Sequence, residues 1–211
     1  MIKRLFDVVA SGCGLLLLSP VFVLCALLVK FTSKGPVFFR QERMGRNGRP
    51  FQILKFRSMV QEAPKLGGAL TAGHDPRVTK VGAVLRKLKL DELPQLINVL
   101  KGEMSFVGPR PEVRKYVEKY PQDYAELLKV RPGITDIASL KYRHETEILG
   151  TYADPERAYV EVILPDKIAL GKEYIQRSSL AFDLKLMIMT VLRMSEAGPP
   201  QVADRSSSTS V

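Results

Sequence analysis

The chain has 211 residues, of which 45% are apolar and 26% are charged, and this balance excludes a chain that is disordered throughout. Its length suits one or two compact units with a buried core. Lys and Arg outnumber Asp and Glu by 32 to 22, so the net charge is +10 and an anionic partner is expected: a phosphorylated substrate, anionic lipid or nucleic acid.

The N-terminal stretch 8–29 contains no charged side chain. A helix crosses a bilayer with roughly 20 apolar residues, so this stretch is long enough for a span. Ser19-Pro20 interrupts it near the middle, where proline removes a backbone donor and bends the helix. The carbonyl that loses its donor needs another partner, which the Ser19 hydroxyl or packed protein can supply.

Basic residues flank this stretch on both sides; they are Lys3, Arg4, Lys30, Lys34, Arg40 and Arg43. The positive-inside rule favours all of them on the cytoplasmic side of a membrane. A helix that enters, bends at Ser19-Pro20 and returns satisfies this rule, whereas a straight span does not. We therefore predict a re-entrant membrane helix over residues 1–34. A single span is an alternative, and so is a signal peptide, although no small-x-small cleavage site precedes Lys30.

The next part of the chain, residues 35–195, is predicted to form an α/β unit that is mostly helical. Two aromatic, apolar runs flank a GRNGRP turn within residues 36–59, which predicts a small β-hairpin. Residues 60–80 are rich in Gly and Pro and indicate an irregular loop. Apolar residues three and four apart predict one helix over 81–102 that ends at Gly102.

Further helices are predicted in the second half. A polar amphipathic helix is expected over 112–130, then a turn at 130–135 and another helix over 154–176. Residues 180–194 are apolar on one face, which suits either the core or a membrane interface. Lys185 and Arg193 favour the second, an interfacial amphipathic helix.

Some features are interpreted as having no chemical role. Residues 196–211 have the composition of a disordered tail. Cys13 and Cys25 lie in the apolar stretch and indicate neither a disulfide framework nor a zinc site. His74 and His144 stand alone and are interpreted as loop or surface residues rather than zinc ligands.

Three arginines suit phosphate binding: Arg86 before an acidic pair, Arg110 inside Gly-Pro-Arg-Pro, and Arg131 inside Arg-Pro-Gly. The prolines on both sides of Arg110 restrict its backbone. Its guanidinium can therefore bind a phosphate through two parallel hydrogen bonds with little entropy left to lose. The alternative is that Pro-Arg-Pro is only a stiff connector.

Asp91 and Glu92 stand side by side after Arg86, Lys87 and Lys89. The nearby cations favour the ionised form of Asp91, and an ionised carboxylate can attack phosphorus to form an acyl phosphate. Glu92 can ligate Mg²⁺, which needs only one or two carboxylates plus substrate phosphates. The alternative is a solvated acidic pair on a basic helix.

The run DPRVTKVGAVLRKLKLDELPQLINVLKGEMSFVGPRPE (75–112) closely resembles the core signature of the bacterial sugar transferase family, in its monotopic type, the phosphoglycosyl transferases that act on polyprenyl phosphate. Three other segments match this family in order: GRNGRPFQILKFRSM (45–59), RPGIT (131–135) and FDLKL (182–186). The match covers residues 1 to 194 and lacks a long N-terminal bundle of spans, which is typical of a small, minimal member.

This resemblance implies an enzyme that transfers a sugar 1-phosphate from a UDP-sugar to a membrane polyprenyl phosphate such as undecaprenyl phosphate, with release of UMP. It implies that Asp91 attacks the phosphate next to the sugar and carries a covalent phosphosugar, while Glu92 helps to hold Mg²⁺. Arg86 and Arg110 fall at positions that the family associates with phosphate binding. The additional site candidates are Lys55, Arg57 and Asp183.

The resemblance also implies a place in the cell. The family's bent membrane helix puts the catalytic unit on the cytoplasmic face of the bacterial inner membrane, where UDP-sugar and lipid acceptor meet. The reaction is then the first membrane step in the assembly of a surface glycan such as exopolysaccharide or lipopolysaccharide. Membrane lipids are expected partners, nucleic acid is not, and a homodimer is considered.

Two positions depart from the family pattern. Many relatives have Ser or Thr where this chain has Lys89, so a Ser-x-x-Glu capping box gives way to another helix start or to a direct charge role. The segment DIASLKYRHETEIL (136–149) also differs and indicates a distinct subgroup, which allows a different sugar.

Two alternatives to this mechanism stay open. The lipid phosphate attacks the donor directly with Asp91 as a base, or the protein is a membrane-anchored basic binding or scaffold protein without catalysis.

Overall fold

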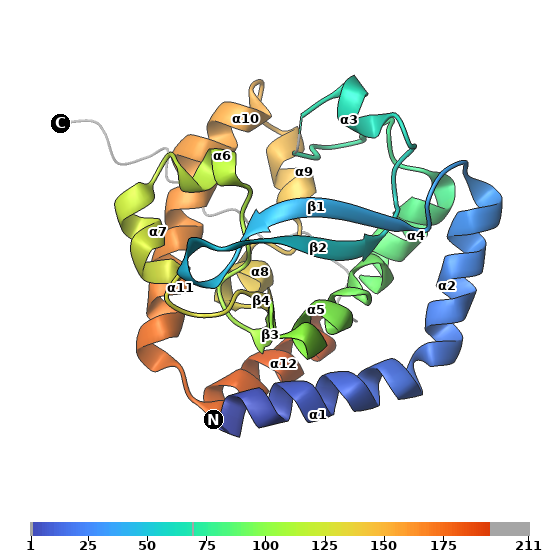
Figure 1. The fold of residues 1–211 in the computed structure, drawn as a ribbon. Coiled ribbons are helices and arrows are strands. Elements are labelled where there is room, and N and C mark those ends of the chain that lie inside the picture. Colours follow the sequence, from blue (N-terminus) through green and yellow to red (C-terminus); the bar gives the residue numbers. More distant parts are fainter. Residues whose placement is uncertain (1, 69, 195–211) are drawn as a thin grey trace.

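The computed structural model describes residues 2–68 and 70–194 (Figure 1). It is mostly helical, as predicted, and contains two small sheets, of which only the hairpin was predicted. The helices are α1 Ile2–Leu17, α2 Ser19–Thr32, α3 Ala63–Leu66, α4 Lys80–Lys87, α5 Gln95–Lys101, α6 Arg114–Val117, α7 Pro121–Leu127, α8 Ile137–Lys141, α9 Glu145–Gly150, α10 Pro155–Ala158, α11 Leu164–Arg177 and α12 Leu180–Met194. The strands are β1 Phe38–Met44, β2 Pro50–Phe56, β3 Ser105–Val107 and β4 Gly133–Thr135. The predicted tail 196–211 lies outside the described residues, and the division at residue 34 stays a prediction.

α1 and α2 meet at a bend of 64°. Pro20 has no backbone N–H to donate to the Leu16 carbonyl, and the Ser19 hydroxyl donates to that carbonyl instead, at 2.8 Å. The predicted helix break at Ser19-Pro20 is therefore confirmed. Within the described part of the chain, no individual helix has both the length and the apolar character to cross a bilayer, whereas the bent pair together has those of a broken span or a re-entrant loop.

α1 runs along the base of the molecule beside α5 (Figure 1). Asp7 is buried and accepts hydrogen bonds from the Ser105 hydroxyl at 3.1 Å and from the Phe106 backbone N–H at 3.2 Å. Lys3 forms an ion pair with Asp183 of α12. Polar contacts thus attach one face of α1 to the rest of the protein, while its large apolar side chains at other positions are exposed.

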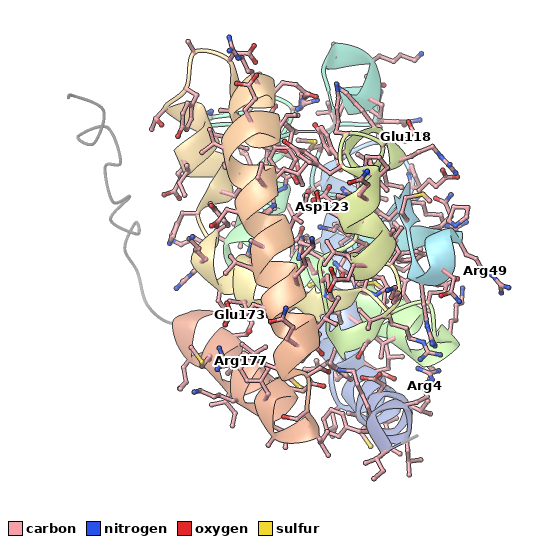
Figure 2. All side chains as sticks on the ribbon, turned by 90° about the vertical axis from the view of Figure 1, so that its left-hand side faces the viewer. Arg4, Arg49, Glu118, Asp123, Glu173 and Arg177 are labelled. Carbon is pink, nitrogen blue, oxygen red and sulfur yellow. The ribbon has the colours of Figure 1, made fainter. Side chains whose placement is uncertain are left out.

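We expect Asp7→Ala to lower the free energy of unfolding by about 1–3 kcal/mol, because the Ser105 hydroxyl and the Phe106 N–H then lack an acceptor inside the protein. Thermal or denaturant unfolding of the purified protein in detergent measures this change. The control Asp123→Ala changes a residue of α7 at the molecular surface (Figure 2). It removes a partly exposed ion pair with α11, in which Lys172 Nζ lies 2.7 Å from the carboxylate. Such a pair contributes less than about 1 kcal/mol, so equal effects of the two substitutions would contradict the anchoring role of Asp7.

The predicted β-hairpin is confirmed. β1 and β2 are antiparallel, with Phe38 opposite Phe56. Their connection contains Asn47 and Gly48 at positive φ, which is the turn chemistry that GRNGRP predicts.

The turn predicted at 130–135 is only partly right, because its last residues form β4 and pair in parallel with β3. These strands were too short to show a period in the sequence. They also approach very closely: a Cβ on Gly133 would lie 2.1 Å from the backbone nitrogen of Gly108, so a larger residue does not fit here.

The single helix predicted over 81–102 is wrong. α4 ends at Lys87, Leu90–Glu92 form a 3₁₀ turn, and α5 begins at Gln95. The chain leaves the helix at Lys89, whose backbone is left-handed with a φ of 57°. Gly102 ends α5 with a φ of 86°, as predicted.

The later helices match the predictions in outline. The helix expected over 112–130 is two short ones, α6 and α7, because Pro121 begins a new helix. The helix over 154–176 is observed as α10, a π-helical turn and α11. α12 buries Leu186 but exposes Ile188 and Val191, so one of its faces packs on the core, and its location at a membrane interface stays a prediction.

Candidate active site

A pocket of about 1880 Å³ opens beside the hairpin, between β1–β2, the segment 57–80, α4 and the segment 136–147. Six predicted site residues line it; they are Lys55, Arg57, Arg86, Asp91, Glu92 and Arg110. They come from β2 and the residue that follows it, α4, the 3₁₀ turn and the Pro-Arg-Pro segment. The fold therefore brings together residues that are far apart in the sequence.

Asp91 and Glu92 have different surroundings. Asp91 is 6% exposed, and its Oδ1 has no hydrogen-bond partner among the described residues. Glu92 Oε1 lies 2.8 Å from Lys55 Nζ and also contacts Arg110. The alternative of a solvated acidic pair is therefore wrong, since one carboxylate is paired with two cations and the other is buried.

The same surroundings set the charges of the site. Burial raises the pKa of the Asp91 carboxyl, and the positive charge of Lys55 opposes this without reversing it. The cations that the sequence predicted to favour ionised Asp91 are present, but burial has the larger effect. Burial acts on Glu92 as well, yet Arg110 and Lys55 outweigh it and hold the pKa of Glu92 well below its usual range. Glu92 is thus the constant negative charge of the site.

Arg86 lies in the last turn of α4. Its Nε donates to Ser58 Oγ at 2.8 Å, and its Nη1 donates to Thr71 Oγ1 at 3.4 Å. Burial lowers the pKa of this guanidinium, and the charge of Asp91 opposes that change. No carboxylate in the described part of the chain forms an ion pair with Arg86. Hydroxyl groups therefore orient this guanidinium, and its charge is available to a phosphate.

Arg110 is held at both its backbone and its side chain. The backbone N–H donates to Asp136 Oδ2 at 3.1 Å, and Nη1 donates to the Ile134 carbonyl at 3.3 Å. The charge of Glu92 raises the pKa of the guanidinium. The Pro-Arg-Pro segment thus places a permanent positive charge next to the acidic pair, and phosphate binding by Arg110 stays a prediction.

The other predicted candidates have different contacts. Arg131 lies outside the pocket, where its Nε donates to the Gly102 carbonyl at 2.8 Å. Asp183 also lies outside the pocket, paired with Lys3. Arg57 reaches the pocket wall, but its guanidinium donates to backbone carbonyls that follow α2. The structure does not bring Arg131 or Asp183 to the acidic pair.

Ser58 and Asp136 also belong to the site, although the sequence did not predict them as site residues. Ser58 orients Arg86. Asp136 accepts hydrogen bonds from the backbone N–H of Arg110 and, at 2.6 Å, from that of Ser139, so it links these two segments. Asp136 directly precedes an apolar run, which is an N-cap signal that would have found it. Ser58 has no comparable signal.

The pocket offers two neighbouring carboxylates, Asp91 and Glu92, to a divalent cation such as Mg²⁺. In residues 2–68 and 70–194, no three His, Cys, Asp or Glu side chains cluster in a way that would hold a metal. Asp91 Oδ1 is an oxygen without a partner, whereas Glu92 would have to exchange its contact with Lys55 or Arg110. Mg²⁺ commonly takes one or two carboxylates and completes its coordination with water and substrate phosphates. The donor set fits an ion shared with a phosphate.

A family model described as bacterial sugar transferase matches residues 1–197. The chain belongs to the bacterial sugar transferase family. Exopolysaccharide production protein ExoY of Rhizobium meliloti (strain 1021) is 39% identical over 206 residues, which cover 90% of this chain and 84% of that protein.

Two longer relatives carry names that state a reaction. The UDP-glucose:undecaprenyl-phosphate glucose-1-phosphate transferase of Escherichia coli (strain K12) is 43% identical over 198 residues, which cover 92% of this chain and 40% of that protein. The UDP-N-acetylgalactosamine-undecaprenyl-phosphate N-acetylgalactosaminephosphotransferase of Aeromonas hydrophila is 39% identical, with 90% and 43% covered. This sugar transferase spans less than half the length of these two relatives.

The departure at Lys89 has a structural consequence in this sugar transferase. Its side chain makes no capping hydrogen bond, so the 3₁₀ turn begins with a left-handed residue instead of a capping box. Lys89 is exposed and lines the pocket, and its charge acts on both carboxylates. Of the two outcomes that the sequence allowed, the structure shows another start, and a direct charge role of Lys89 stays a prediction.

Proposed function

We propose that this sugar transferase moves a sugar 1-phosphate from a UDP-sugar to a membrane polyprenyl phosphate such as undecaprenyl phosphate, and releases UMP. The names of its relatives support this reaction. One observation carries it on this chain: Asp91, whose buried Oδ1 has no hydrogen-bond partner among the described residues, lines a pocket together with Arg86, Arg110 and Lys55. A nucleophile without a partner beside several cations suits attack on a diphosphate.

The proposed reaction has two displacements at one phosphorus atom. Asp91 Oδ1 attacks the phosphorus next to the sugar, its bond to that phosphorus forms, and the bond to the UMP oxygen breaks. An oxygen of the polyprenyl phosphate then attacks the same phosphorus, and the bond to Asp91 breaks. The products are UMP and polyprenyl-diphosphate sugar, and Asp91 returns to its starting state. The alternative is direct attack by the lipid phosphate, with Asp91 as a base.

The cations have separate proposed tasks. Arg86 binds a donor phosphate with its free charge, and Arg110 binds the transferring phosphate next to the acidic pair. Glu92 Oε1 contacts both Lys55 and Arg110, and Oε2 accepts a further hydrogen bond from Arg110 Nη1 at 3.4 Å, so Glu92 holds both cations in position. Such preorganised charges stabilise the charge that develops in the transition state.

Mg²⁺ is proposed to take part when it is bound, held by Glu92 and Asp91 together with substrate phosphate. It would neutralise charge on the phosphates, which is its usual contribution to phosphoryl transfer.

The bent helix pair is proposed to lie in the bacterial inner membrane as a re-entrant loop, with the pocket on the cytoplasmic side. The flanking basic residues and the apolar side chains exposed on α1, α2 and α12 support this placement. The lipid phosphate then reaches the pocket at the membrane surface. A homodimer stays a prediction.

Release of UMP tests the proposed function. Purified protein in detergent or nanodiscs is incubated with a panel of UDP-sugars, undecaprenyl phosphate and Mg²⁺, and we expect UMP from at least one donor, with loss of the reaction in EDTA. A protein that binds membranes but releases no UMP from any donor would favour the binding or scaffold alternative.

A further inference from the structure

The segment 136–149, which departs from the family pattern, contributes one wall of the donor pocket. It contains α8 and α9, and Ser139 and His144 are among its residues that line the pocket. His144 was interpreted from the sequence as a loop or surface residue, but its side chain is only 19% exposed. A divergent segment in a substrate pocket is a natural place to look for the origin of specificity.

Two polar atoms of this wall lack partners. Ser139 Oγ and His144 Nε2 are buried and form no hydrogen bond with the described residues. Asp91 Oδ1, the proposed nucleophile, has the same property. Buried polar atoms in native proteins are nearly always hydrogen-bonded, so each exception needs an explanation. A ligand that carries hydroxyl groups would satisfy both wall atoms, because a hydroxyl donates and accepts.

The contact of His144 with Glu147 indicates whether the unpartnered Nε2 donates or accepts hydrogen bonds. Glu147 Oε1 lies 3.2 Å from His144 Nδ1. A carboxylate only accepts hydrogen bonds, so Nδ1 donates to Glu147, and in the tautomer that carries its single proton on Nδ1 the atom Nε2 is an acceptor. Ser139 is held by its backbone N–H on Asp136, while its hydroxyl turns about a single side-chain bond. The wall thus offers an acceptor and a group that both donates and accepts.

Asp136 connects this wall to the reacting phosphate. Its Oδ1 accepts from the backbone N–H of Ser139, and its Oδ2 accepts from that of Arg110. Arg110 in turn contacts Glu92, next to Asp91. In a UDP-sugar the sugar is bonded directly to the phosphate that Asp91 attacks, so the sugar must lie near Arg110. The nucleoside lies one phosphate farther away.

The wall is also rigid. Lys141 Nζ and Tyr142 Oη each donate to Asp166 of α11 at 2.7 Å, and Glu145 forms an ion pair with Lys167 of the same helix. Contacts on the side of α11 therefore hold the wall without using Ser139 Oγ or His144 Nε2. A preorganised wall loses little freedom when a ligand binds.

We propose that Ser139 and His144 form the sugar subsite and select the donor through the hydroxyl groups of its pyranose ring. This proposal rests on the proposed function. His144 Nε2 accepts a hydrogen bond from one hydroxyl, and Ser139 Oγ donates to or accepts from another. A pocket that hydrogen-bonds a hydroxyl discriminates against a donor that places it elsewhere, because its own polar atoms are then left unpaired.

The test compares four variants with the wild type on UDP-glucose, UDP-galactose, UDP-N-acetylglucosamine and UDP-N-acetylgalactosamine. Ser139→Ala and His144→Asn should lower kcat/KM for the preferred donor by roughly tenfold or more and reduce its preference over the C4 epimer. His144→Gln places an amide near the position of Nε2 and should retain more of the preference than His144→Asn, which differs by one methylene. Thr151→Ala, an exposed residue after α9 that does not line the pocket, is the matched control.

Inhibition by UMP separates the sugar from the nucleoside. The proposal requires the inhibition constant of UMP to stay within about twofold of wild type in all variants, and thermal unfolding checks that each variant is folded. Weaker UMP inhibition with unchanged donor preference would indicate that the wall binds the nucleoside, and it would overturn the proposal. Donor preferences equal to those of wild type would also overturn it. Failure of the wild type to release UMP from any donor is a different result, which contradicts the proposed function itself.

Discussion

Asp91→Asn should abolish UMP release while the protein still folds and binds membranes. The amide oxygen is a poor nucleophile and cannot serve as a base, so the loss is expected to be on the order of 10⁴-fold or more. Folding should not suffer, because Asn keeps the shape of a side chain whose burial raises its pKa. At a pH above the raised pKa of Asp91, its buried charge costs the folded state free energy, and the substitution removes that cost.

Intact-protein mass spectrometry distinguishes the two roles of Asp91. Wild type incubated with UDP-sugar but no lipid should release one equivalent of UMP and gain the mass of a sugar phosphate, whereas Asp91→Asn should do neither. Asp123→Asn, on the exposed surface between α7 and α11, controls for changes that do not concern the pocket. Turnover by Asp91→Asn would refute both roles, and turnover by wild type without an adduct would leave Asp91 as a base.

Arg110→Gln should have the next largest effect, with losses in both activity and stability. The transferring phosphate loses a fixed positive charge, which typically reduces kcat by about 10²–10³-fold when one such donor is removed. Glu92 loses one of its two cationic partners, and a buried charge with fewer hydrogen bonds costs about 1–3 kcal/mol. UMP release and denaturant unfolding measure the two losses separately.

The double variant Arg110→Gln, Glu92→Gln should recover none of the activity, since it does not replace the phosphate contact. It should recover the stability only in part, because Lys55 then loses its carboxylate partner. Arg131→Gln is the matched control, because Arg131 also follows the pattern of an arginine beside proline but lies outside the pocket. We expect it to retain activity within about threefold, by analogy with other side chains that touch no reacting group. A loss equal to that of Arg110→Gln would contradict the boundary of the site.

Local rules were sufficient for several parts of this fold. Proline lacks a backbone N–H in any context. The residues Ser19 and Pro20 were therefore enough to predict the bend and the hydrogen bond of the Ser19 hydroxyl. Asn47 and Gly48 tolerate positive φ, so the hairpin turn was predictable in the same way. Gly102 ended a helix for the same reason.

The spacing of apolar residues gave wrong predictions where tertiary contacts determine the local backbone. The apolar spacing over 81–102 predicted one helix, but the left-handed backbone of Lys89 breaks it and places Asp91 and Glu92 in a separate turn. That break gives the two carboxylates different surroundings, which no pattern of charges distinguishes. The pair β3–β4 was missed because its strands are short and joined only across a long sequence separation.

The sequence by itself determined the residue types of the site, the family and the bent helix, because these depend on local chemistry and on ordered motifs. Only the tertiary structure decided which of the predicted arginines and carboxylates lie together in the pocket. It put Arg110 beside Glu92 and Arg131 beside Gly102, and it buried Asp183 against Lys3 instead of in the pocket. The physical reason is that burial and ion pairing depend on segments that meet in space. The number of residues between two positions therefore says little about the electrostatic surroundings of either side chain.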